Sequence, residues 1–144
     1  MQKNFSEARR HCYNNYYELA TIESFAEDEL LQEFIAKIGG GGLHFYTSGS
    51  NRRETRNFEW ESKGTLLRDT YIHDSVIDYV AHTDDKLKNQ CVTVYGREYK
   101  DQPWQWNVYP CSQEFNFICE RVTQECRVPE PGSPPPSERN VFSY

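Results

Sequence analysis

The stretch Phe115-Asn116-Phe117-Ile118-Cys119-Glu120 decides the fold of this chain. Its residues alternate well enough to predict a strand that ends on a cysteine. Upstream, Cys91-Val92-Thr93-Val94-Tyr95 predicts a second strand that begins on one. Five cysteines in 144 residues indicate an oxidising compartment, where disulfides form and persist. The residues alone leave three pairings open among the first four cysteines, so the segments around them have to decide the pairing.

Two helices are predicted upstream of these strands. Residues 6–12 predict a short helix with Ser6 as its N-cap. Ser24-Phe25-Ala26-Glu27 is a capping box, and it opens a stronger helix with an apolar face at helical spacing. That face consists of Leu30, Leu31, Phe34, Ile35 and Ile38. Gly39 to Gly42 end the helix, because glycine adopts the left-handed cap at little cost.

Short strands are predicted at residues 19–22, 44–47 and 58–60. Residues 61–90 carry little periodicity and many turn formers. A connection of that length inside a compact domain is usually functional or covalently pinned. The sequence therefore predicts an α+β fold with two helices, short antiparallel strands and a long irregular loop region.

Several segments, taken in order, resemble the C-type lectin family. Phe5-Ser6-Glu7-Ala8 followed by Cys12 is similar to the family's first helix, and residues 19–24 are similar to the entry of its second. Trp106-Asn107 before Cys111 and the strand that ends at Cys119 are similar to its closing loop and last strand. The resemblance implies a disulfide-stapled C-type lectin-like domain over residues 1–120. Residues 45–49, Phe-Tyr-Thr-Ser-Gly, resemble the variant that is common in arthropod members.

The resemblance implies two disulfides, Cys12–Cys119 and Cys91–Cys111. A disulfide that closes a loop of about 100 residues is worth about 4.7 kcal/mol in the chain-entropy model. The second disulfide would clamp the loop region that carries the ligand site in this family. The family's first strand pairs with the strand ending at Cys119 and should precede Phe5. Since almost nothing precedes Phe5, we expect this strand to be truncated.

The resemblance also locates the family's calcium-dependent sugar site. Sugar-binding members hold calcium with an acid-Pro-Asn or Gln-Pro-Asp triplet and with Trp-Asn-Asp, because calcium takes roughly six to eight oxygen ligands. Counting back from Cys91, the triplet's place is Ala81-His82-Thr83, which has no proline and no carboxylate. Trp106-Asn107 are kept, but Val108 replaces the aspartate. We therefore expect no cofactor and no metal at the usual sugar site.

A candidate ligand surface combines polar residues of the loop region with aromatic side chains. Its residues are Thr83, Asp84, Asp85, Tyr99, Asn107 and Tyr109. If the loop alignment shifts by a few residues, Asp84 and Asp85 would replace the lost carboxylates. Tyr99 and Tyr109 suit a protein epitope or a glycan bound by stacking.

The remaining residues disfavour catalysis, metal binding by histidines, nucleic-acid binding and a membrane span. No nucleophile has a base at a recognisable spacing, so no enzyme is expected. His44, His73 and His82 lack metal-ligand spacing and are expected to be surface histidines, whereas Trp104 and Trp106 are expected in the core. A net charge of -6 gives no footprint for nucleic acid. No stretch approaches the roughly 20 apolar residues that span a bilayer.

Two further features concern the ends of the chain. Asn4-Phe5-Ser6 is an N-glycosylation sequon, which makes Asn4 a candidate acceptor in a glycoprotein. Residues 121–144 are rich in proline and predict a linker. Alternatively, Cys126 with Pro129 and Gly132, followed by Phe142-Ser143-Tyr144, resembles the start of a complement-control (sushi) repeat, as in selectin-like ectodomains. In the second case the partner of Cys126 would lie beyond Tyr144. In the first case Cys126 would be an unpaired thiol or form an interchain disulfide.

These observations predict an extracellular domain, secreted or part of a cell-surface ectodomain. The first hypothesis is calcium-independent binding of a protein partner in cell adhesion or an extracellular complex. The alternative is a carbohydrate-binding lectin with a shifted calcium site, for which Asn107, Asp84 and Asp85 are the motivating residues. A purely structural domain that positions its neighbours is a third hypothesis.

Overall fold

The computed structural model describes residues 2–53, 57–82, 88–121 and 142–143. These residues form three α-helices, one 3-10 helix and nine strands in an α+β arrangement. In chain order the elements are α1 (Phe5–Asn14), β1 (Tyr17–Leu19), α2 (Phe25–Lys37), β2 (His44–Ser50), β3 (Glu59–Trp60), β4 (Thr65–Leu66), η1 (Leu67–Asp69), α3 (Asp74–His82), β5 (Gln90–Tyr95), β6 (Gln105–Pro110), β7 (Asn116–Phe117), β8 (Cys119–Arg121) and β9 (Phe142–Ser143). None of the helices in the described ranges is long and apolar enough to cross a membrane.

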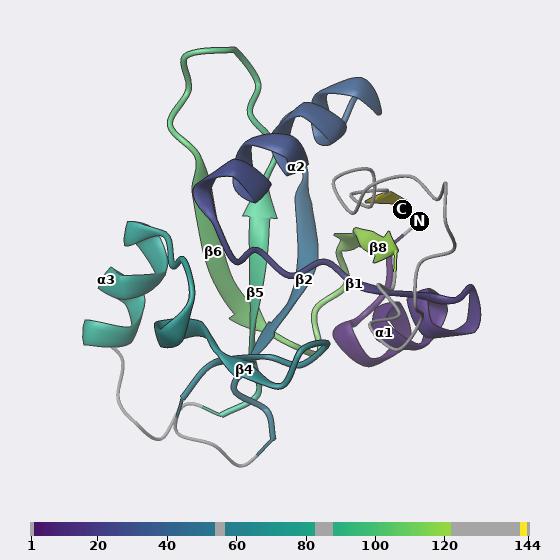
Figure 1. The fold of residues 1–144 in the computed structure, drawn as a ribbon, viewed down its shortest axis with the longest axis vertical. Coiled ribbons are helices and arrows are strands. Elements are labelled where there is room, and N and C mark those ends of the chain that lie inside the picture. Colours follow the sequence, from purple (N-terminus) through teal and green to yellow (C-terminus); the bar gives the residue numbers. More distant parts are fainter. Residues whose placement is uncertain (1, 54–56, 83–87, 122–141, 144) are drawn as a thin grey trace, which may run out of the picture.

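The main sheet has the strand order β4-β3-β2-β5-β6, with β7 paired to β2 in parallel. Helix α2 lies across one face of this sheet, as Figure 1 shows. Side chains of α2, of that sheet face, of η1 and α3 and of the connecting segments form the main core, which consists of Ala20, Ile22, Leu31, Ile35, Phe45, Phe58, Trp60, Leu67, Val76, Val92, Val94, Trp106 and Ile118. Because strand residues alternate between faces, the intervening residues of β2, β5 and β6 point to the opposite face.

The small sheet has the order β1-β8-β9, with β8 antiparallel to both neighbours. Beside it lies a second core, made of Phe5, Ala8, Cys12, Leu19, Tyr46, Cys91, Phe117 and Cys119. Cys12 of α1 is bonded to Cys119 of β8, and Cys91 of β5 is bonded to Cys111. These are the two pairs that the sequence resemblance implied, and the predicted α+β class is confirmed.

Some local predictions were wrong in position. The N-cap of α1 is Asn4 and not Ser6, because the Asn4 Oδ1 atom accepts a hydrogen bond from the Glu7 amide at 2.9 Å. The first strand covers residues 17–19 and not 19–22. The predicted last strand divides into β7 and β8, because Phe117 pairs with β2 whereas Cys119 pairs with β1. Ser24 is the N-cap of α2, with the Glu27 amide donating to Ser24 Oγ, but the Glu27 carboxylate accepts from the Glu23 amide and not from that of Ser24 as in a full capping box.

A third helix, α3, occupies the segment that the sequence left irregular. The sequence of α3 has only a short helical pattern, but two long-range contacts hold the helix against β6. Val76 is completely buried in the main core. The Ser75 hydroxyl donates to the carbonyl of Trp106 at 2.6 Å and accepts from the Trp106 amide at 3.1 Å. Since β6 is the last strand of the main sheet, Ser75 satisfies backbone groups that no neighbouring strand reaches.

We expect the substitution Ser75→Ala to lower the free energy of unfolding by about 1 to 2 kcal/mol, because it leaves the Trp106 carbonyl and amide without their partner. Urea denaturation measures the change. Ser112→Ala is the matched control, since Ser112 is exposed. An equal, near-zero effect of both substitutions would show that Ser75 does not fasten α3 to the sheet.

Candidate functional site

Four aromatic rings meet on the face of the main sheet opposite α2. The ring of His44 lies 5.0 Å from Tyr95, 5.2 Å from Tyr109 and 5.4 Å from Phe115, measured between centroids. Tyr109 and Phe115 are themselves 5.0 Å apart. All four side chains are partly buried, so each ring has one side in the cluster and one toward solvent. We call the four rings, with Asn107 beside them, the aromatic face.

The register of the sheet builds this face. His44 is opposite Tyr95 on β5, and Cys91 of the same strand is opposite Tyr109 on β6. On β6, Trp106 is completely buried in the main core. Because β6 alternates, Asn107 and Tyr109 must therefore point to the other face.

Phe115 is positioned by the turn that follows β6. The hydroxyl of buried Tyr46 donates its one hydrogen to the Gln113 carbonyl at 2.5 Å, and the carbonyls of Pro110 and Cys111 lie 3.3 and 3.4 Å from the same oxygen. On the other side, the backbone of Phe115 exchanges two hydrogen bonds with Lys3. Phe115 also contacts the ring of Tyr46 at 5.4 Å, so the aromatic face continues into the second core.

The rings of His44 and Tyr95 on the aromatic face favour their uncharged forms near neutral pH. Burial lowers the pKa of His44, which favours the neutral imidazole. Its Nδ1 atom is buried and has no hydrogen-bond partner among the residues that the structure describes. The Tyr95 hydroxyl donates to the Glu98 carboxylate, and this hydrogen bond raises the pKa of Tyr95. The face therefore presents uncharged rings with polar edges.

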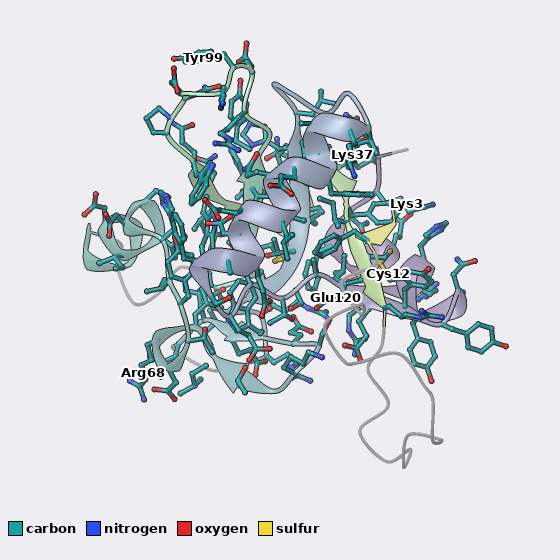
Figure 2. All side chains as sticks on the ribbon, turned by 45° about the horizontal axis from the view of Figure 1, so that its top comes forward. Lys3, Cys12, Lys37, Arg68, Tyr99 and Glu120 are labelled. Carbon is teal, nitrogen blue, oxygen red and sulfur yellow. A yellow bond between two sulfur atoms is a disulfide. The ribbon has the colours of Figure 1, made fainter. Side chains whose placement is uncertain are left out.

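The structure separates the predicted ligand residues. Asn107 and Tyr109 lie together on the aromatic face, whereas Tyr99 projects from the β5–β6 hairpin, where its side chain is 63% exposed (Figure 2). Thr83, Asp84 and Asp85 lie outside the described residues. Sequence reasoning missed His44 and Phe115; their signal was the strand alternation that places aromatic residues where a solvated face would carry polar ones.

Two other predictions about side-chain positions need correction. Trp104 is not a core residue: it is partly exposed, its ring lies 4.6 Å from that of Phe25, and the guanidinium of Arg97 lies 5.2 Å above it. His44 is not an ordinary surface histidine, because packing against three rings encloses its imidazole. Trp106 does lie in the core, where its Nε1 atom donates to Asp28.

The described residues at the family's sugar site do not fit calcium. Ala81 and His82 belong to the last turn of α3, and Val108 is apolar and packs against the main core. Asn107 offers one amide oxygen, whereas calcium takes several oxygen ligands. Across residues 2–53, 57–82, 88–121 and 142–143, no group of three or more His, Cys, Asp or Glu side chains could hold a metal ion.

Asn4, the predicted glycosylation acceptor, is partly buried at the N-terminus of α1. Its Nδ2 atom donates to the Glu7 carboxylate at 2.7 Å. The residue lies on a polar depression of about 440 Å³ that is also lined by Ser6 and Arg52. The bond to Glu7 uses one of the two hydrogens of this amide nitrogen.

A cluster of buried acids joins the small sheet to the start of α2. Glu120 is 9% exposed and accepts a hydrogen bond from the Thr21 amide at 3.1 Å. Burial raises the pKa of Glu120 to about 7 and also raises that of Glu27. Lys63 lies 3.8 Å from Glu18 and is the nearby cation. Glu120 is thus partly protonated near neutral pH.

The comparison with known families agrees with this architecture. The Lectin C-type domain family matches residues 1–121, so the chain belongs to the C-type lectin domain family. The chain is 30% identical to C-type mannose receptor 2 of Homo sapiens over 124 residues, which cover 85% of this chain and 7% of the receptor. It is 24% identical to salivary C-type lectin 2 of Aedes albopictus over 122 residues, or 79% of this chain and 74% of that lectin.

Solved structures share the fold. The carbohydrate-recognition domain of the mouse scavenger receptor C-type lectin superposes with a TM-score of 0.59 at 21% identity, covering 85% of this chain and 84% of that one. EMS16, an antagonist of the collagen receptor integrin α2β1, gives a TM-score of 0.54 at 19% identity and 82% coverage of both chains. Domains of this family recognise glycans or proteins outside the cell, in secreted proteins and receptor ectodomains.

The raised pKa of Glu120 predicts how stability depends on pH. The folded pKa of about 7 exceeds the ordinary 4.5, so the charged carboxylate destabilises the fold. That penalty is absent below about pH 4.5, grows between 4.5 and 7 and is complete above 7, where it reaches about 3 kcal/mol. We expect Glu120→Gln, which keeps an acceptor for Thr21, to raise the free energy of unfolding at pH 8 but not at pH 4.5.

Urea denaturation at the two pH values measures this difference. Glu114→Gln is the matched control, because Glu114 is exposed. If Glu120→Gln changed the free energy of unfolding equally at both pH values, the burial of a raised-pKa carboxyl would be contradicted.

Proposed function

We propose that this chain binds an extracellular protein partner without calcium, using the aromatic face. The observation that carries the proposal is the cluster of His44, Tyr95, Tyr109 and Phe115 on one sheet face, with ring centroids 5.0 to 5.4 Å apart. Tyrosine side chains combine a flat apolar surface with a polar edge, and they are enriched at the energetic centres of protein interfaces.

The aromatic face is also pre-organised. Ring contacts on several sides and the backbone bridge between Lys3 and Phe115 fix its geometry. Side chains that are already ordered lose little conformational entropy when a partner binds. Because the rings are neutral, their desolvation carries no ionic penalty. A partner with an apolar patch and a few hydrogen-bonding groups suits this surface.

Calcium independence is supported by the residues at the family's sugar site. Val108 supplies no oxygen ligand from its side chain, and the Ala81-His82-Thr83 triplet contains no carboxylate. EMS16, which has this fold, is described as an antagonist of an integrin. Its example supports protein binding by the fold, although its low identity carries no residue-level argument.

The alternative is a glycan-binding lectin with a shifted calcium site. Asn107 favours it, because this amide remains on the surface at the position where sugar-binding members use one. Asp84 and Asp85 would supply the carboxylates. The mouse scavenger receptor domain, which has the same fold, is described as a carbohydrate-recognition domain.

Calorimetric titration with calcium chloride separates the two proposals. We expect no heat of binding at millimolar calcium, because the described donor set is too small. Calcium binding that disappears in the double variant Asp84→Ala/Asp85→Ala would contradict calcium-independent function and favour the glycan alternative. A glycan array with and without chelator would then identify the sugar class.

The aromatic face itself is tested by binding to a panel of purified receptor ectodomains in the presence of EDTA. We expect Tyr109→Ala to weaken binding to a partner from this panel at least tenfold, or about 1.4 kcal/mol. Tyr13→Ala is the matched control, since Tyr13 is 77% exposed on α1, outside the ring cluster. Equal loss in both variants, or none in Tyr109→Ala, would exclude the aromatic face as the contact.

A further inference from the structure

A polar depression of about 440 Å³ lies where three segments of the chain meet. It is lined by the start of α1, the residues around the start of β5 and the turn after β6, together with Arg52. The start of β5 and the end of β6 lie at the same end of the main sheet (Figure 1). The volume falls within the range of roughly 300 to 1,000 Å³ that is usual for small-ligand sites. We call this feature the basic depression, after its two cations, Arg52 and Lys88.

Backbone contacts hold the walls of the basic depression in place. The Cys111 amide donates to the Asn89 carbonyl at 2.9 Å, and the Phe5 amide donates to the Cys111 carbonyl at 3.0 Å. The disulfide between Cys91 and Cys111 joins the two strands covalently at this end. Since the walls are already formed, a ligand would not have to order them when it binds.

The side chain of Arg52 is held in one orientation. The Glu61 carboxylate, whose side chain is only 1% exposed, accepts from Arg52 Nε at 2.7 Å and from Nη2 at 2.9 Å. The Arg52 guanidinium also lies 4.9 Å above the ring of Phe5. A guanidinium has five N–H hydrogens, and Glu61 accepts two of them. Arg52 is therefore ordered and still has donors for a second acceptor.

The charges behind the basic depression do not cancel. Two carboxylates face three guanidiniums there: Arg52 lies 2.7 Å and Arg9 3.9 Å from Glu61, and Arg53 lies 2.6 Å from Glu59. Three cations against two anions leave one excess positive charge. The lysine of the depression adds a second, and none of the described lining residues is acidic. In a chain with a net charge of -6, this is a local positive region.

The rest of the lining consists largely of amides and hydroxyls. Asn4, Asn89 and Ser112 contribute side chains that both donate and accept hydrogen bonds. The hydroxyl groups of a sugar need partners of this kind. A guanidinium binds the oxygens of an anionic group in pairs, through charge-assisted hydrogen bonds. The combination of ordered cation, exposed lysine, amides and hydroxyls thus suits a sugar that carries a permanent negative charge, and a sulfate ester supplies one.

We propose that the basic depression binds a sulfated saccharide, with Arg52 and Lys88 in contact with the sulfate ester and with Asn89 and Ser112 in contact with sugar hydroxyls. Calcium takes no part in this recognition. The site is separate from the family's sugar position, because Asn107 does not line the depression. It is also distinct from the aromatic face, so it adds to the proposed function and does not depend on it.

The test uses a chondroitin 4-sulfate tetrasaccharide, with its chemically desulfated form as the matched ligand control. The full chain is produced in a bacterial periplasm, where disulfides form and no glycan is attached to Asn4. Isothermal titration calorimetry in the presence of EDTA measures the affinity without any contribution from calcium. We expect the sulfated tetrasaccharide to bind about tenfold or more tightly than the desulfated form, because the two cations lose their partner in the latter. Equal affinities, or no binding of either at millimolar concentrations, would overturn the proposal.

Two variants place the sulfate at the basic depression. We expect Lys88→Gln to weaken binding about fivefold, as the loss of one exposed ion pair does, and Ser112→Asp to weaken it about tenfold or more, because it adds a carboxylate to the lining. Lys100→Gln is the matched control: it removes the same charge from an exposed residue of the β5–β6 hairpin and should leave the affinity unchanged. Equal losses in Lys88→Gln and Lys100→Gln would overturn the proposal, since the attraction would then be to the overall charge.

Backbone amide chemical shifts locate the bound saccharide directly. We expect the largest changes on titration at Asn89 and Ser112 and none at Tyr99. The Tyr109→Ala variant should bind the tetrasaccharide as the unaltered chain does, so a failure of the aromatic face and a failure of this site can be told apart. Largest changes at Asn107 would assign the sugar to the family's usual position and would also overturn the proposal.

Discussion

The buried indole of Trp106 is the contact on which the rest of this structure depends. Its ring packs edge-on against Trp60 at 5.8 Å and Tyr71 at 5.6 Å. Its Nε1 atom donates to Asp28 of α2, and its backbone is held by Ser75 of α3. One residue therefore fixes two helices and the loop region to the edge of the main sheet. Because Trp106 must point inward, the residues on either side of it must point outward, and the orientation of the aromatic face follows.

The two cores have different relations to the aromatic face. The main core supports α2 and leaves the opposite sheet face open. The second core reaches that face through Tyr46, whose ring contacts both Phe5 and Phe115. Since the Cys12–Cys119 and Cys91–Cys111 disulfides both belong to this second core region, the aromatic face rests on the covalently fastened part of the molecule. Such support favours a rigid aromatic face, which suits the proposed binding of a partner.

Local signals in the sequence predicted part of this structure. The capping-box pattern at Ser24 located α2, and Asn4 with Glu7 has the same spacing, so it could have identified the N-cap of α1. Long-range contacts determined what local signals could not. Helix α3 depends on one buried valine and on the bond between Ser75 and Trp106, and β9 depends on pairing with a strand 20 residues upstream. The ring cluster around His44 brings together side chains of β2, β5, β6 and the turn before β7, and no local sequence pattern relates these four segments.

The anchoring of α3 to Trp106 has a consequence for behaviour at high concentration. An exposed edge strand is a template on which another chain can add a strand, and proteins that leave such edges open tend to aggregate. Ser75 bonds to both the amide and the carbonyl of Trp106, so these two groups on the outer edge of the main sheet are not available to a strand of another molecule. The molecule thus has an aromatic face on one side of the main sheet, while Ser75 discourages further strands from adding to the sheet's edge.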